Sequence, residues 1–178
     1  MAQWIALLRG INVGGRNTLP MADLRALLEG LGAEGVRTYI QSGNAVFRSP
    51  ARGAAALEEG IAAAVESERG FRPGVRVLRP AQVRAALDGS PWASRADSKQ
   101  VHVSFLGAKP APGRLEALRE LATAGEEVEL DGKCLHLHTP NGMARSKLAA
   151  AIEARLGVPA TTRNLRTVAA LVELCDPG

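Results

Sequence analysis

Two short segments near the N-terminus contain the residue types best suited to holding an anionic ligand. Residues 10–17, here the 10–17 loop, combine three glycines with Arg16, and residues 41–44, here the 41–44 turn, are polar around a glycine. Glycines let a backbone approach a ligand closely, and a guanidinium group binds a phosphate or carboxylate through two parallel hydrogen bonds. In this hypothesis Arg16 pairs with the anion, three asparagines orient it and Ser42 donates a hydrogen bond. The candidate ligand-binding residues are Asn12, Gly14, Gly15, Arg16, Asn17, Gln41, Ser42, Gly43 and Asn44.

The 10–17 loop also has two competing interpretations. Gly10 and Gly15 have the GxxxxG spacing of a nucleotide-binding P-loop, but Arg16 and Asn17 stand where that motif needs Lys and Ser or Thr. We therefore do not predict a nucleoside triphosphatase. The other interpretation is a long surface loop that needs glycines only to turn. The corresponding loop of the second half, residues 107–112, lacks this polar set, which favours a function for the first loop.

A second polar cluster lies at residues 161–167. A threonine there suits the N-cap of a final helix, which would place Arg163 and Arg166 in the first turn, where the helix dipole disfavours cations. We expect Arg163 and Asn164 to face the N-terminal half as further ligand-binding residues, with Arg163 joining Arg16 in a two-arginine clamp. In the alternative, this helix closes the sheet of the second half and both arginines of the cluster are solvated.

Three histidines and a thiol form the remaining group with possible chemistry. Cys134, His136 and His138 alternate along one predicted strand, and His102 lies on a neighbouring strand, on the face opposite its flanking valines. We expect the four side chains to meet on the non-helical face of the second sheet. Zinc accepts such ligands, but no CxxC or HExxH motif accompanies them, and polar residues on an open sheet face are the more usual explanation. We predict neither a metal nor a cofactor, and no motif assigns a catalytic residue.

Composition limits the classes of protein that remain. The chain has 178 residues, a net charge of +4 and two cysteines, and no apolar run approaches the ~20 residues that span a bilayer. We expect a cytoplasmic protein without membrane attachment, and for its oligomeric state, which the sequence leaves open, a monomer is slightly favoured. Only six residues are aromatic, whereas a protein that stacks bases on a sheet needs aromatics there. The leading hypothesis is a protein that binds, or acts on, a small anionic or phosphorylated ligand. The alternatives are a nucleic-acid-binding protein and a protein-interaction module without catalysis.

Apolar periodicity predicts the elements that position these residues. In the first half, strands are predicted at residues 4–9, 36–41, 44–48 and 75–79, and helices at residues 21–31 and 57–65. In the second half, strands are predicted at residues 101–105, 128–130 and 135–137, and helices at residues 115–121 and 148–156, followed by the final helix. Each half therefore begins with the order βαββα, which is ferredoxin-like.

The predicted fold class is α+β, with two ferredoxin-like halves packed together, mainly antiparallel sheets and helices on one face of each. The predicted domains are residues 1–90 and 98–178, joined by a linker and forming one compact unit. In this topology the loop after the first strand and the tip of the hairpin share one end of the sheet. The 10–17 loop and the 41–44 turn should therefore lie side by side.

Three segments carry a resemblance to a known family. Residues 8–17, residues 37–44 and residues 161–164 are similar to motifs of the bacterial family called domain of unknown function 1697, in which the position of Leu165 is commonly Trp. The resemblance implies a compact cytoplasmic α+β protein without an established activity. It supplies no catalytic residues, but the glycine-rich loop and the Thr-Arg-Asn segment are recurrent features of that family.

Overall fold

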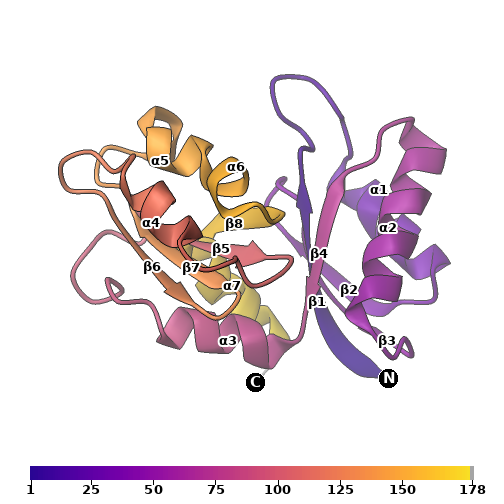
Figure 1. Ribbon diagram of the computed structural model, residues 1–178. Helices are drawn as coiled ribbons and strands as arrows, with labels where there is room; N and C mark the ends of the chain where they lie inside the picture. The colour runs from indigo at the N-terminus through magenta and orange to yellow at the C-terminus, as the bar shows by residue number, and fades with distance from the viewer. Residues whose placement is uncertain (177–178) are drawn as a thin grey trace. The chain divides into compact units, whose positions relative to one another are not determined.

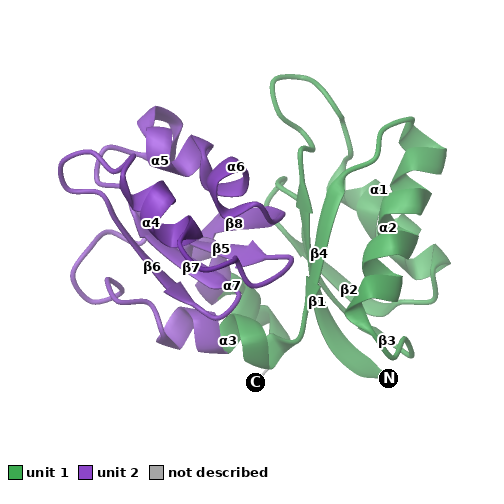
Figure 2. Cartoon of the chain, viewed as in Figure 1, with its two compact units in different colours: residues 1–84, 170–178 green, residues 85–169 purple. Residues whose placement is uncertain are grey.

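The computed structural model describes residues 1–176 and divides into two compact units (Figure 1, Figure 2). The first unit comprises Met1–Arg84 and the C-terminal residues from Ala170 onward, and the second comprises Ala85–Ala169. The predicted domains, residues 1–90 and 98–178, stay a prediction. Among the described residues, no helix combines the length and apolar composition needed to cross a bilayer.

The first unit has the predicted ferredoxin-like order. Its elements are β1 (Ala2–Arg9), α1 (Met21–Gly30), β2 (Glu34–Tyr39), β3 (Asn44–Ser49), α2 (Ala54–Arg69) and β4 (Gly74–Leu78), followed by α3 (Pro80–Asp88). The sheet is antiparallel, with strand order β2-β3-β1-β4. The central strand β1 therefore pairs with both β3 and β4, and its C-terminal end leads into the 10–17 loop.

The second unit repeats this topology. Its elements are β5 (Val101–Leu106), α4 (Arg114–Arg119), β6 (Glu127–Asp131), β7 (Cys134–His138), the 3-10 turn η1 (Met143–Arg145), α5 (Lys147–Ala150), α6 (Ile152–Leu156) and β8 (Ala160–Asn164). The last helix, α7 (Leu165–Cys175), begins in this unit and ends in the first. The antiparallel strand order β6-β7-β5-β8 matches that of the first sheet. The predicted α+β class with two ferredoxin-like halves is confirmed.

The start of the final helix was predicted incorrectly. Residues 160–164 form β8, which pairs antiparallel with β5, so Arg163 lies on a strand and not in the first turn of a helix. The helix begins at Leu165, and its N-cap is Asn164, whose Oδ1 accepts a hydrogen bond from the backbone N–H of Thr167 at 2.9 Å. The second unit therefore completes the full βαββαβ order.

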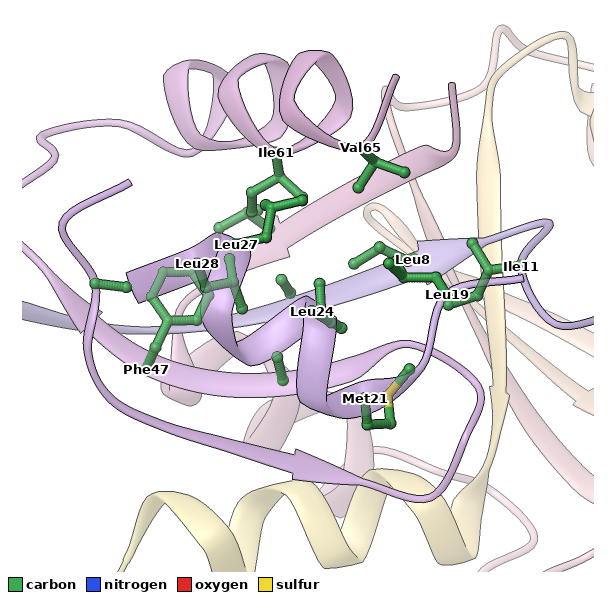
Figure 3. Close-up of a cluster of buried hydrophobic side chains, with 14 of the residues drawn as sticks. Leu8, Ile11, Leu19, Met21, Leu24, Leu27, Leu28, Phe47, Ile61 and Val65 are labelled. Atoms are coloured by element: carbon green, nitrogen blue, oxygen red, sulfur yellow. The ribbon is translucent and has the colours of Figure 1, made fainter. Parts of the chain in front are cut away.

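The core of the first unit lies between the sheet and its two helices (Figure 3). Leu24 and Leu28 of α1 and Ile61 of α2 are at most 1% exposed, and they pack with Phe47 of β3. Leu24 and Leu28 are four residues apart, which places both on the same face of α1. Burying each such side chain contributes roughly 1.5–3 kcal/mol. The second unit has an equivalent core that includes Leu118, Leu135 and Leu137.

Each sheet is also buried on its second face. In the first unit, Ile5 and Leu7 of β1 point away from the helical core and are fully buried. On this face Gln3 donates a hydrogen bond to the carbonyl of Cys175, and Arg37 donates one to the carbonyl of Leu174. These bonds satisfy carbonyls that the last turn of α7 leaves without helical partners. They attach the end of α7 to the first unit.

We expect the substitution Asn164→Ala to lower the free energy of unfolding by about 1 kcal/mol, because it removes the N-cap of α7. Urea unfolding followed by circular dichroism measures the change. The control is Asn141→Ala, at an exposed asparagine, which should leave stability within ~0.5 kcal/mol. Equal effects of the two substitutions would contradict the assigned cap.

Candidate functional site

The 10–17 loop is a small, closed hairpin. The N–H of Asn12 donates to the carbonyl of Asn17 at 3.1 Å, and the N–H of Arg16 donates to the carbonyl of Val13 at 3.0 Å. Between them, Gly14 and Gly15 both have positive φ angles, of 57° and 70°. Positive φ at both central residues is the signature of a type I′ turn, which glycine adopts without steric cost. The loop therefore has one defined shape.

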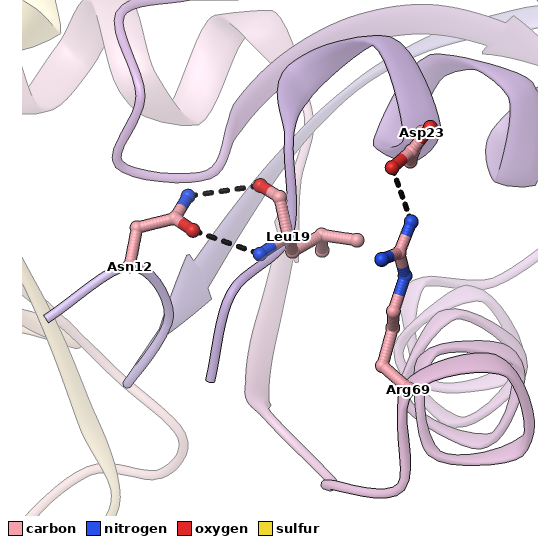
Figure 4. Close-up of polar contacts among 4 residues, drawn as sticks. All are labelled: Asn12, Leu19, Asp23 and Arg69. Atoms are coloured by element: carbon pink, nitrogen blue, oxygen red, sulfur yellow. Dashed lines mark hydrogen bonds and ion pairs between the residues drawn. The ribbon is translucent and has the colours of Figure 1, made fainter. Parts of the chain in front are cut away.

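The side chain of Asn12 fixes this hairpin to the rest of the unit. Its Nδ2 donates to the carbonyls of Leu19 at 2.9 Å and Gln41 at 2.8 Å, and its Oδ1 accepts from the N–H of Leu19 at 2.8 Å. Figure 4 shows the paired bonds between Asn12 and Leu19. The bond to Gln41 joins the 10–17 loop to the 41–44 turn. The predicted proximity of the two segments is confirmed.

The 41–44 turn is held equally closely against the end of β1. The N–H of Leu8 donates to the carbonyl of Gly43 at 2.8 Å. Gly43 has a φ of +81°, and a Cβ built on it would lie 2.7 Å from Cβ of Leu8 and 2.9 Å from Cδ1 of Ile11. Only glycine fits such a position without displacing its neighbours.

The structure gives the three asparagines of the predicted site structural contacts. Asn12 makes the bonds described above, and Asn17 donates to the carbonyl of Gly10 at 2.8 Å. Asn44 is fully buried, and its Nδ2 donates to the carbonyl of Tyr39 and to the hydroxyl of Ser42. Because Asn44 has no accessible surface, it cannot orient a ligand from solvent.

The exposed groups of the corner are fewer than the sequence predicted. Of the predicted residues, Gly14, Gly15, Arg16, Asn17 and Gln41 are exposed. The backbone N–H groups of Gly14 and Gly15 have no hydrogen-bond partner within the described part of the chain. The first turn of α1 begins nearby, but it already carries Asp23, which forms an ion pair with Arg69 (Figure 4). The loop thus offers the free N–H groups of Gly14 and Gly15 next to the exposed Arg16.

The two candidate residues near the C-terminus lie in the second unit. Arg163 on β8 donates from Nη1 to the carbonyl of Thr162 at 2.9 Å, and burial lowers the pKa of its guanidinium to about 10. Asn164 caps α7. Since Arg16 belongs to the first unit, the clamp of Arg16 and Arg163 stays a prediction.

The expected meeting of the histidines is wrong. His102 pairs across the strands with Leu137, on the helical face, whereas His136 pairs with Val103 on the other face. His102 therefore lies on the face opposite His136 and His138. Among the described residues, no three His, Cys, Asp or Glu side chains are placed to hold a metal ion. The second face is not open either, because Val103 and His136 are at most 2% exposed.

Sequence reasoning missed a groove in the second unit. A cavity of about 560 Å³ lies beside β6, with walls that include Trp92, Arg95 and Arg119. Its volume falls in the range of ligand-binding pockets. The acidic run at residues 126–129 and the Pro91-Trp92 pair were visible signals in the sequence, but they are distant in the chain and only the fold brings them together.

Comparisons with known proteins agree with the resemblance found in the sequence. The family model described as "Protein of unknown function (DUF1697)" matches residues 1–136. Among solved structures, a conserved bacterial protein from Streptococcus pneumoniae is similar, with a TM-score of 0.71, 24% sequence identity and coverage of 98% of each chain. At this identity the likeness shows the fold alone. Among curated proteins, no match was found.

We expect the substitution Gly43→Ala to lower the free energy of unfolding by roughly 2–5 kcal/mol, because it adds both backbone strain and steric overlap. The matched control is Gly14→Ala, which has a positive φ but nothing within 4 Å of the added Cβ. It should cost only roughly 1–2 kcal/mol. Urea unfolding of both variants measures the difference, and equal losses would show that the close approach to Leu8 is unimportant.

The stability of the protein should fall as the pH drops below the ordinary histidine pKa of about 6.5. Burial lowers the pKa of His136 and of His102 in the folded protein. The unfolded chain therefore takes up protons first as the pH falls, which favours unfolding. Urea unfolding between about pH 8 and about pH 5 measures this loss, and the variant His136→Gln should lose less. An identical loss in the variant would contradict this assignment.

Proposed function

The chain belongs to the protein family of unknown function DUF1697, and we propose that it is a binding protein that takes the anionic group of a small ligand on the 10–17 loop. One observation carries the proposal: the asparagines of the loop hold it in a single shape, and this leaves Arg16 exposed at its tip. A recognition loop that is already ordered loses less conformational entropy on binding.

The local charge supports an anionic ligand. Residues 8–20 contain Arg9 and Arg16 and no acidic residue, and residues 35–47 contain Arg37 and no acidic residue. The Arg16 guanidinium would bind a phosphate or carboxylate through two hydrogen bonds. The free N–H groups of Gly14 and Gly15 would supply further donors next to it. No residue is assigned a catalytic role in this proposal.

A protein partner is the second candidate for the same corner. Val13 is 67% exposed and Ile40 is 53% exposed. Each is adjacent in the chain to one end of the hydrogen bond between Asn12 and Gln41, so the two aliphatic side chains lie at the same corner. Exposed aliphatic groups beside an arginine suit a protein contact. The nucleic-acid alternative has less support, because the second faces of both sheets are buried at their central strands.

The test of the anion proposal is a thermal-shift screen with inorganic phosphate, citrate and a panel of phosphorylated metabolites. A ligand present at 100 times its Kd stabilises the folded protein by roughly 2.7 kcal/mol. The substitution Arg16→Ala should weaken a genuine ligand roughly 10- to 100-fold, since a charge-assisted hydrogen-bond pair is lost. Arg52→Ala, at another exposed arginine of the first unit, is the matched control and should change nothing.

The same screen separates the two candidates. Hits that stabilise the Arg16→Ala variant as well as the original protein would contradict the anion site. The double substitution Val13→Ser and Ile40→Asn should leave phosphate binding unchanged if the ligand is a small anion. If phosphate does not bind to the protein, and the double substitution abolishes binding of a protein partner, the protein-interaction candidate replaces the anion proposal.

A further inference from the structure

The strand β6 is an open edge of the second sheet. The strand order β6-β7-β5-β8 leaves β6 paired on one side only. Its pairing with β7 is regular over the whole strand, from Glu127 opposite His138 to Asp131 opposite Cys134. By contrast, the equivalent edge of the first sheet, β2, is interrupted by a shift of register between Glu34 and Arg37. Irregularities of that kind protect an edge from pairing, and β6 has none.

The free hydrogen-bonding groups of this edge can be identified from the hairpin. Asp131 and Cys134 flank a two-residue turn, so their backbone groups bond to each other. From there along β6, residues whose backbone bonds to β7 alternate with residues whose backbone does not. The backbone groups of Val128 and Leu130 therefore point away from β7. Among the described residues, the only bond recorded to them is a marginal one, from Nη2 of Arg119 to the carbonyl of Val128 at 3.5 Å.

The groove of about 560 Å³ lies beside the first part of this edge, where Glu127, Val128 and Glu129 line it. Its other lining residues include Trp92 and Arg95, from the segment after α3, and Arg119 of α4. Trp92 is fixed in place by stacking on His138, with ring centroids 6.0 Å apart. A preformed groove thus borders the edge strand beside Val128, where an added strand would lie.

The side chains of β6 alternate in character across its two faces. Glu127, Glu129 and Asp131 lie on the face of His138, His136 and Cys134, and all three acids are exposed. Val128 and Leu130 lie on the other face, with the helical core. Beneath the acidic row, His136 is 2% exposed and its Nδ1 has no hydrogen-bond partner among the described residues. Arg119, on the groove wall, is partly neutralised by Glu116 at 3.5 Å.

We propose that the β6 edge is a docking site for an extended segment of a partner protein in which basic and aliphatic residues alternate. The segment adds a fifth strand to the second sheet through the backbone groups of Val128 and Leu130. Its basic side chains lie opposite Glu127, Glu129 and Asp131, and its aliphatic side chains continue the row of Val128 and Leu130. Opposite charges directly across a strand pair stabilise the pairing, and like charges oppose it. This site is independent of the proposed anion site in the first unit.

The test uses a capped five-residue peptide, acetyl-Lys-Val-Lys-Val-Lys-amide. Binding is followed by Trp92 fluorescence in the variant Trp4→Phe, because these are the two tryptophans of the chain. We expect saturable binding, together with slowed hydrogen exchange at the amides of Val128 and Leu130, which face outward in the free protein. The double substitution Glu127→Gln and Glu129→Gln should weaken binding roughly 3- to 10-fold. The matched control Glu120→Gln, at an exposed glutamate of the same unit, should not.

Methylated peptides distinguish strand addition from plain charge attraction. In an antiparallel addition the valine N–H groups bond to β6, so N-methylation of both valines should weaken binding roughly 10-fold or more, whereas N-methylation of the lysines should not. The proposal is overturned if neither methylation weakens binding, if both do so equally, or if the Glu-Val-Glu-Val-Glu peptide binds as well. Absence of binding of the Lys-Val peptide also overturns it.

Discussion

The carboxamide of Asn12 is the contact on which the candidate site of the first unit depends. It bonds to both backbone groups of Leu19, at the approach to α1, and to the carbonyl of Gln41, at the tip of the β2–β3 hairpin. One side chain therefore joins the 10–17 loop to the approach to α1 and to the distant hairpin tip. The bond from Leu8 to Gly43 closes the same corner from the side of β1. Removing the bonds to Leu19, which are partly buried, would leave polar backbone groups without their protein partner, at roughly 0.5–1.5 kcal/mol for each bond.

Much of the fold could be predicted from the sequence because its elements have strong periodic signals. The stripe through Leu24 and Leu28 predicts α1, and the topology then places the 10–17 loop beside the 41–44 turn. The strand β8 could not be recognised in this way, because residues 160–164 contain no alternation of apolar and polar side chains. The two threonines, which favour strands, were the available signal. The face of His102 could not be deduced either, since β5 is buried on both faces and its valines do not mark the helical one.

The roles of the asparagines could not be predicted from the sequence either. Asparagine is equally suited to binding a ligand and to bonding with neighbouring backbone groups in turns, and its residue type does not distinguish the two. Asn12 has a structural role because its side chain bonds to the backbone of Leu19 and Gln41. Asn44 has a structural role because it is buried. A ligand can bind only the part of the loop that makes no internal contact. Only the folded structure shows which part this is.

Backbone strain distinguishes this corner from an ordinary turn. Among the described residues, three that are not glycine have positive φ: Asn12 and Asn17 in the 10–17 loop, and Ile40, which directly precedes the 41–44 turn. Asparagine tolerates this conformation, but a β-branched residue does so only at a steric cost. Ile40 is more than half exposed, so burial in the core does not compensate for its strain. A strained and exposed aliphatic residue is more consistent with a contact surface than with a structural turn, because glycine or asparagine would form the same turn more stably. The second unit, with the same topology and a short turn at Gly132, has no such residue in its described part.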